Sequence, residues 1–149
     1  MSLVTQLDND FKTALKAKDA KKLSILRLVR SSIKNLEIQK QGQASDEDVV
    51  EILQREIKQH KESIDAFKKA ERDDEVNKLT SEIELLDVYL PEKLSTDELK
   101  DVIEKAIEDT QAQSMQDMGK VMGSVMSQVK GRAGGDEVGS MVRDLLSDK

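Results

Sequence analysis

The sequence predicts an all-α protein, on the strength of three observations. Apolar residues recur at intervals of three and four along most of the chain, which is the spacing of one face of an α-helix. The apolar content is aliphatic, because only 2% of the 149 residues are aromatic. The chain contains a single proline, a residue that helix interiors exclude. Segments that alternate apolar and polar residues between turn dipeptides, as β-hairpins do, are not found.

Four amphipathic helices are predicted in residues 1–91, where they form a helical bundle. The third is long, at roughly 25 residues, or about 37 Å at the helical rise per residue. The spacing of the apolar stripes is typical of helices that pack on one another. The four stripes are Leu3, Leu7, Phe11 and Leu15; Leu23, Leu26, Val29, Ile33 and Leu36; Val50, Leu53, Ile57, His60, Ile64 and Phe67; and Val76, Leu79, Ile83, Leu86 and Leu90.

The second and third helices are separated by a polar segment with both a stop and a start signal. Gly42 can end the second helix, because glycine adopts the left-handed conformation found after helix ends. Ser45 can cap the third helix. Asp46, Glu47 and Asp48 then lie in its first turn, where the helix dipole favours anions.

A domain boundary is predicted just after Pro91. The residue before a proline avoids helical geometry, so the fourth helix should end there. Ser95 and Glu98 then have the spacing of a capping box, which starts a helix in a new direction. We therefore expect two domains, 1–91 and 92–149.

Three helices are predicted in the smaller domain, residues 92–149. The first has an apolar stripe between Leu99 and Ile107, and the second spans about residues 115–129. A loop, KGRAGG, follows. The last helix begins at about Asp136, which we expect to be its N-cap.

Composition excludes several classes of function. The net charge of −6 argues against a strongly basic nucleic-acid-binding protein but allows a local basic face. Without cysteine the chain has no disulfide and no thiolate nucleophile. The N-terminus lacks the pattern of a signal peptide, and no stretch approaches the ~20 apolar residues of a membrane span. We expect a soluble, cytoplasmic protein without a membrane partner.

The sequence predicts no catalytic residue, no metal site and no cofactor. His60 is the only histidine, and its place on an apolar stripe indicates a core or half-buried position. Zinc chemistry would need more ligands of this type. Ser31 and Lys34 match the S-x-x-K pattern of an activated serine, but the companion motifs are missing. A polar helix face explains this pair better.

The segment 118–138 is unusual because it contains five of the seven glycines. Gly119, Gly123 and Ser127 form a ridge of small residues at intervals of four. Glycine inside a helix costs about 1 kcal/mol relative to alanine, so something is expected to approach this ridge closely. A neighbouring helix and the backbone of a ligand are both compatible with the spacing.

Two groups of cations are candidates for binding nucleic acid. The first lies in the same glycine-rich segment. The second lies on one face of the second helix, where pairing with acids of the third or fourth helix is the competing interpretation. The candidate residues are Lys120, Lys130, Arg132, Gly119, Gly123 and Gly131, with Arg27, Arg30 and Lys34 as a secondary basic face.

The chain resembles the GatB/YqeY family, and specifically its stand-alone YqeY-like proteins. The resemblance is strongest in the pattern GK-x-MG … KGRAGG, from Gly119 to Gly135, and the YLPEKLS junction is similar to the family's domain linker. Position 134 departs from the pattern, since relatives often have an acid where this chain has Gly134. Residues 92–149 also resemble the tail domain of the GatB component of the tRNA-dependent amidotransferase.

This resemblance implies an N-terminal helical bundle, a small C-terminal three-helix domain and association with tRNA. It does not imply catalysis by this chain alone, because the family's carbon–nitrogen ligase activity, with glutamine as amido donor, belongs to other subunits and domains. The expected function is that of a non-catalytic, translation-linked accessory protein. The alternatives are a helical protein–protein adaptor and an amidotransferase-linked component that acts only with other subunits. The expected partners are tRNA and amidotransferase or aminoacyl-tRNA-related proteins.

Overall fold

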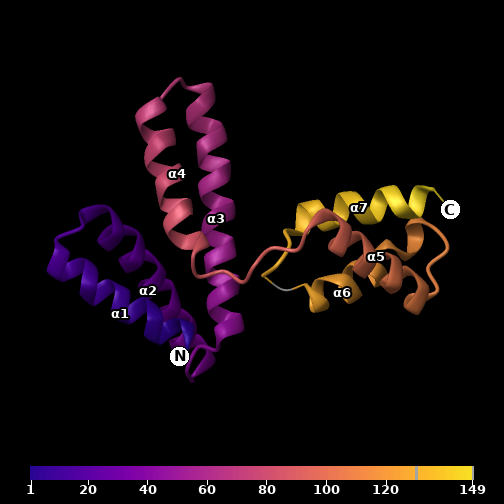
Figure 1. Ribbon diagram of the computed structural model, residues 1–149, viewed down its shortest axis with the longest axis horizontal. Coiled ribbons are helices and arrows are strands. Elements are labelled where there is room, and N and C mark those ends of the chain that lie inside the picture. The colour runs from indigo at the N-terminus through magenta and orange to yellow at the C-terminus, as the bar shows by residue number, and fades with distance from the viewer. Residues whose placement is uncertain (130, 149) are drawn as a thin grey trace. The chain divides into compact units, whose positions relative to one another are not determined.

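The computed structural model describes residues 1–129 and 131–148, and within these ranges the chain is helical and contains no strand (Figure 1). The all-α prediction is confirmed. The helices are α1 (Leu3–Ala17), α2 (Ala20–Lys40), α3 (Asp46–Lys69), α4 (Asp73–Asp87), α5 (Thr96–Thr110), the short 3₁₀ helix η1 (Met115–Asp117), α6 (Met118–Gln128) and α7 (Gly135–Ser147).

The chain divides into two compact units, Met1–Leu90 and Pro91–Lys149. Each has its own apolar core. Independent folding of the predicted domains 1–91 and 92–149 stays a prediction. Among the described residues, no helix combines the length and the apolar character that crossing a lipid bilayer requires.

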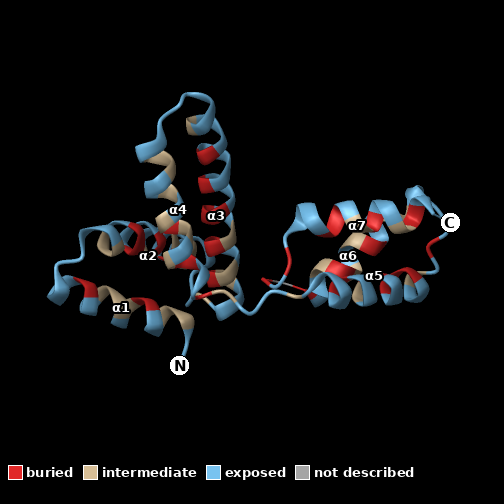
Figure 2. Cartoon of the chain, turned by 45° about the horizontal axis from the view of Figure 1, so that its top comes forward, coloured by how far each residue is buried: buried red, intermediate tan, exposed pale blue. Residues whose placement is uncertain are grey.

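The first unit consists of two helical hairpins, α1 with α2 and α3 with α4 (Figure 1). Their inward faces form one core, drawn in red in Figure 2. Leu15 belongs to the predicted buried stripe of α1 but is 45% exposed, because α1 packs through Leu7 and Ala14, two turns apart. The core residues are Leu7, Ile25, Leu26, Val29, Ile33, Val49, Ile52, Leu53, Ile57, Leu86 and Tyr89.

The start of α3 follows the prediction for Ser45. The Ser45 hydroxyl accepts the Asp48 N–H at 3.1 Å, and the Asp48 carboxylate accepts the Ser45 N–H at 2.9 Å. Lys40 Nζ lies 2.6 Å from the same carboxylate. The hydrogen bond from Lys40, followed by that from the Ser45 N–H, lowers the pKa of Asp48 to about 2. The loop between α2 and α3 is thus closed by a charged cap.

The end of α2 differs from the prediction for Gly42. Gln41 takes the left-handed conformation, with φ 56°, and Gly42 follows it and donates its N–H to the Glu37 carbonyl at 3.2 Å. The helix therefore ends without using the conformational freedom of glycine.

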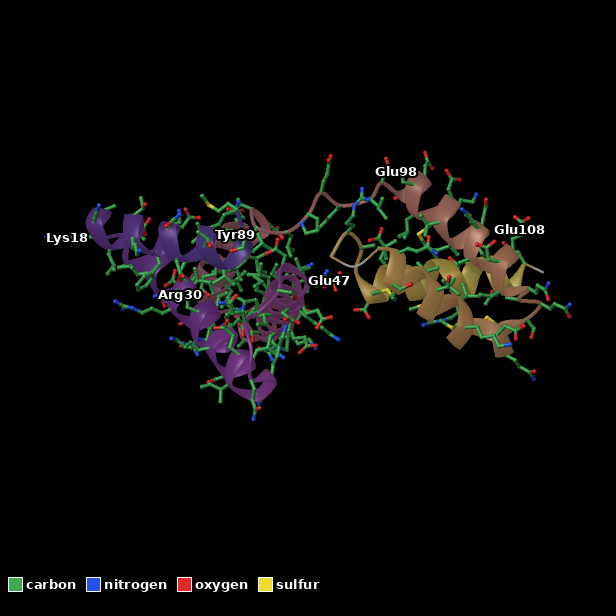
Figure 3. The ribbon with its side chains drawn as sticks, turned by 90° about the horizontal axis from the view of Figure 1, so that it is seen from below. Lys18, Arg30, Glu47, Tyr89, Glu98 and Glu108 are labelled. Carbon is green, nitrogen blue, oxygen red and sulfur yellow. The ribbon has the colours of Figure 1, made fainter. Side chains whose placement is uncertain are left out.

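A hydrogen bond joins the C-terminal end of the first unit to α1. The Tyr89 hydroxyl donates a hydrogen bond to Asp10, and burial together with this bond raises the pKa of Tyr89 (Figure 3). Helix α4 ends at Asp87, four residues before Pro91, so the proline does not itself end the helix. Pro91 instead opens the segment that leads to α5.

The second unit packs α5, α6 and α7 around one apolar core. Ser95 caps α5 by accepting the Glu98 N–H at 3.1 Å, which is the serine half of the predicted capping box. Gly134, and not Asp136, is the N-cap of α7, so Asp136 lies in the first turn. The core residues are Leu99, Ile103, Ala106, Ile107, Ala112, Val121, Val125, Val129, Ala133, Val138, Val142 and Leu146.

Candidate nucleic-acid interface

The small-residue ridge of α6 faces outward. Gly119, Gly123 and Ser127 are all exposed, while Val121 and Val125 on the other side of the helix are fully buried. A Cβ atom added to Gly119 or Gly123 would meet no atom within 4 Å. The interpretation that a neighbouring helix of this chain packs on the ridge is therefore wrong. The sequence shows the periodicity of α6, but not which side its neighbours cover.

The close helix contact of this unit uses a different glycine. Gly139 of α7 is buried, and a Cβ atom there would lie 3.9 Å from Met122 Cε and 4.0 Å from Met118 Cε. Gly139 therefore lies beside two methionines of α6, at distances that would also allow an alanine. Sequence reasoning missed it, because Gly139 stands alone and has no partner at helical spacing.

Lys120 lies on the exposed side of α6, between the two ridge glycines in sequence. The nearby Asp117 carboxylate accepts the Gln113 N–H at 2.9 Å. This bond, and more weakly the Ser114 N–H and the charge of Lys120, lowers the pKa of Asp117. Asp117 therefore stays ionised and offsets part of the local positive potential.

Arg132 has a structural task within the second unit. Its Nε donates to the Glu92 carbonyl at 3.1 Å, and its own carbonyl accepts the Leu94 N–H at 2.9 Å. The loop after α6 is thus tied to the segment before α5. Gly131 enters this loop with φ 77°, a conformation that disfavours any other residue. Lys130, also predicted as a site residue, lies outside the described residues.

The secondary basic face on α2 is partly neutralised. Arg30 Nε lies 2.9 Å from Asp8 Oδ1, and its guanidinium stands 4.2 Å from the centre of the Phe11 ring (Figure 3). The acid comes from α1, and not from α3 or α4 as the competing interpretation expected. Arg27 and Lys34 are exposed. The three predicted cations therefore differ, because Arg30 forms an ion pair within the chain whereas Arg27 and Lys34 are exposed.

A groove that the sequence did not predict lies between α2 and α4. It encloses a volume of about 560 Å³ and opens to solvent. Leu28, at its edge, is 44% exposed. The residues that line it include Leu23, Ser24, Arg27, Leu28 and Ser31 of α2 and Glu82 of α4.

His60 is buried, as its position on the apolar stripe predicted, but two acids are buried with it. His60 Nε2 lies 2.5 Å from Glu82 Oε2, and Nδ1 lies 3.0 Å from the Glu56 carbonyl oxygen. Because a carbonyl only accepts, Nδ1 must carry a proton. The short contact to Glu82 joins the other ring nitrogen to a carboxylate. The pair links α3 to α4.

A signal for this cluster was present in the sequence. Glu56 and Glu82 each fall on an apolar stripe, three residues after Leu53 and Leu79. An acid on a buried face needs a partner. In the part of the chain that the structure describes, no group of three histidine or acidic residues is arranged to hold a metal ion.

Comparison with known proteins finds a family whose model covers nearly the whole chain. The model of the family "Yqey-like protein" matches residues 4–146. The chain is 35% identical to a Saccharomyces cerevisiae protein over 64% of its own length and 52% of the relative's. A Lachancea thermotolerans protein is 40% identical over 58% of this chain and 47% of the relative. A Pyrenophora tritici-repentis protein is 27% identical over 99% of this chain and 82% of the relative.

All three relatives are named "Altered inheritance of mitochondria protein 41, mitochondrial". The chain spans about half the length of the two yeast relatives that it matches. The similarity to the third covers nearly all of this chain.

Proposed function

Because the chain belongs to the Yqey-like protein family, we propose that it is a non-catalytic, tRNA-associated accessory protein of translation, related to the tRNA-binding tail of the amidotransferase. The proposed contact surface consists of the α6 ridge and the loop that follows it, with Lys120, Lys130 and Arg132 as its cations. The amidotransferase and aminoacyl-tRNA-related proteins are the protein partners that this function suggests.

The observation that supports the proposal most is the outward-facing ridge. Each glycine inside a helix costs about 1 kcal/mol relative to alanine. Gly119 and Gly123 make no compensating contact with the described residues outside their own helix backbone, because the space beside them is open. A partner that must approach the helix backbone closely would account for both positions. The exposed Lys120 beside them suits a phosphate backbone.

The chemistry of the second unit favours recognition of RNA shape over base stacking. The chain's aromatic residues are Phe11, Phe67 and Tyr89, and all lie in the first unit. Stacking platforms for single-stranded bases are therefore missing from the proposed surface. Folded RNA is recognised largely through its backbone and 2′-hydroxyl groups, for which cations and small residues are sufficient.

The proposed process is compatible with two cellular compartments. The relatives carry mitochondrial names, and translation takes place both in mitochondria and in the cytoplasm. For this chain we propose the cytoplasm, the location expected from its sequence.

One observation favours an adaptor as the second candidate function. Met115 is 42% exposed and precedes the ridge, and flexible methionines are typical of surfaces that bind partner helices. A protein helix could pack on the ridge in the same way that Met118 and Met122 pack on Gly139. An adaptor of this kind could also serve the amidotransferase, as a component that acts only with its other subunits.

Titration of the full chain with folded tRNA at several salt concentrations tests the proposal. The logarithm of the binding constant should fall with the logarithm of salt with a slope of about −2 to −3, because three cations neutralise three phosphates. The Lys120→Ala/Lys130→Ala/Arg132→Ala variant should lose binding. The matched control is Lys100→Ala/Lys105→Ala/Arg143→Ala, which removes the same charge from exposed positions of α5 and α7.

Thermal melts of both variants separate lost binding from lost folding, which is needed because Arg132 ties the loop to the linker. Equal losses of affinity in the two variants would point to general electrostatic attraction and contradict the proposed site. The absence of tRNA binding by the wild type at low salt would exclude the RNA function and leave the adaptor.

A further inference from the structure

The groove between α2 and α4 has no role in the proposed tRNA contact. It lies in the first unit, and two helices form its walls. It is open along one side and has an apolar edge residue, Leu28, that is 44% exposed. Its lining comes from α2, with Glu82 as the contribution of α4, and an open hollow of this kind along a helix can receive a partner helix.

The same face of α2 extends beyond the groove. Arg27, Ser31, Lys34 and Ile38 follow one another at intervals of four, three and four residues, which places them on one side of the helix. Ile38 is 72% exposed. Leu28 and Ile38 are separated by about 15 Å along the helix axis, so an apolar stripe on a partner helix of three to four turns could contact both.

The charge on this face is positive, although the whole chain has a net charge of −6. Between Asp19 and Glu37 the sequence contains no acid. Arg30 is paired with Asp8. Arg27, whose guanidinium lies 5.8 Å from the centre of the Phe11 ring, and Lys34 are exposed cations of this face. Glu82, the acid that lines the groove, is paired with His60 at 2.5 Å and so does not oppose an acidic partner.

We infer that this surface docks an acidic amphipathic helix of a partner protein, with the partner's apolar side over Leu28 and Ile38 and its carboxylates facing Arg27 and Lys34. Ser24 and Ser31 are small and allow the backbone of that helix to come close.

RNA is the less suitable occupant of this face. Two outward-facing cations would neutralise about two phosphates, and phosphates gain nothing from exposed leucine and isoleucine. The apolar side chains contribute binding free energy only when another apolar surface covers them.

The probe for this inference is a synthetic helical peptide of about 18 residues, long enough to span ~27 Å. It has leucines at intervals of three and four and glutamates on both flanks, and it is labelled with fluorescein for anisotropy measurements against the full chain. A second peptide with lysine in place of every glutamate has the same apolar stripe. The acidic peptide should bind at least about tenfold more tightly, a difference of about 1.4 kcal/mol.

Three variants locate the binding. Arg27→Glu should weaken the acidic peptide by about tenfold and strengthen the basic one, because the charge at the groove has been reversed. Ile38→Ser should weaken both peptides, and its high exposure keeps the fold intact. Lys58→Glu, the same change of charge at an exposed position of α3, should leave both unchanged.

Equal affinity for the two peptides, or no change in Arg27→Glu, would overturn the inference. Displacement of the acidic peptide by folded tRNA, with tRNA binding lost in Arg27→Glu, would overturn it in favour of nucleic acid. Equal peptide affinities or an unchanged Arg27→Glu variant leave the proposed function untouched, because the variants of that experiment all lie in the second unit. Loss of tRNA binding in Arg27→Glu would also contradict the proposed tRNA surface on α6.

Discussion

The two units place their polar and strained features in different parts of the structure. Within the described residues, the buried ionisable side chains are Glu56, His60, Glu82 and Tyr89, and all four belong to the first unit. The second unit has an apolar interior, and two glycines occupy an exposed helix face, where they lower helix stability. The first unit therefore uses polar groups to join its helices. In the second unit, exposed glycines lower the stability of a surface helix and leave its backbone accessible to a partner.

Separating the two units is the experiment with the largest expected effect on the structure, because a fragment is either folded or unfolded. A fragment of residues 91–149 should be helical and melt cooperatively, since its core is closed. It should begin before Glu92, whose carbonyl accepts from Arg132. Circular dichroism during heating is the measurement. A random-coil spectrum would show that the second unit depends on the first.

The buried charge cluster predicts the next largest effect. His60→Leu removes the partner of Glu82 and leaves that acid buried, which should lower the free energy of unfolding by about 3 kcal/mol. The double variant His60→Leu/Glu82→Leu should recover part of the loss, because the charge of Glu82 is removed as well, while Glu56 stays buried without His60 beside it. Urea denaturation of the full chain measures both. A mild effect of the single variant would mean that water reaches the pair.

Gly131 provides the corresponding test in the second unit. Gly131→Ala must adopt φ 77° with a Cβ atom, which should cost about 1–2 kcal/mol. Gly134→Ala is the matched control, because Gly134 has φ −78° and open space around it. Chemical denaturation should separate the two variants. If they are equally stable, the loop relaxes without the left-handed conformation.

The cap of α3 predicts a smaller, pH-dependent effect. The pKa of Asp48 is lowered from 3.8 to about 2 in the folded chain, so the carboxylate stabilises the fold above its unfolded pKa. This stabilisation is lost as the pH falls through about 2. Asp48→Asn should remove that part of the acid dependence, and Lys40→Ala should weaken it. Thermal melts between neutral and acidic pH measure the effect, and an unchanged profile in Asp48→Asn would contradict it.

The sequence was sufficient for features that depend on neighbours along the chain. Periodicity predicted the helices, and the residue type of Ser45 before the third helix predicted its cap. Features that depend on tertiary packing could not be predicted from the sequence. The partner of Arg30 comes from α1, and Glu56 and Glu82 meet at His60 only because α3 and α4 form a hairpin.

The glycine ridge illustrates the same limit within one helix. On α6, the ridge lies beside Met118 and Met122, and the spacing of either set is compatible with a buried face. The burial of Val121 and Val125 in the core turns the ridge toward solvent. Residue type alone favours Asp136 as a cap, whereas the extended backbone at Gly134 determines where α7 begins.

The central claim is that the α6 glycines serve a partner and not the packing of this chain. Gly123→Leu tests it most directly when stability and tRNA affinity are measured on the same sample. The variant should be as stable as the wild type or more stable by up to about 1 kcal/mol, because the added Cβ meets open space. Its tRNA affinity should fall by at least about tenfold, while Ser140→Leu, at an exposed position of α7, should change it little. Unchanged tRNA binding by a stable Gly123→Leu variant, or a large loss of its stability, would contradict the claim.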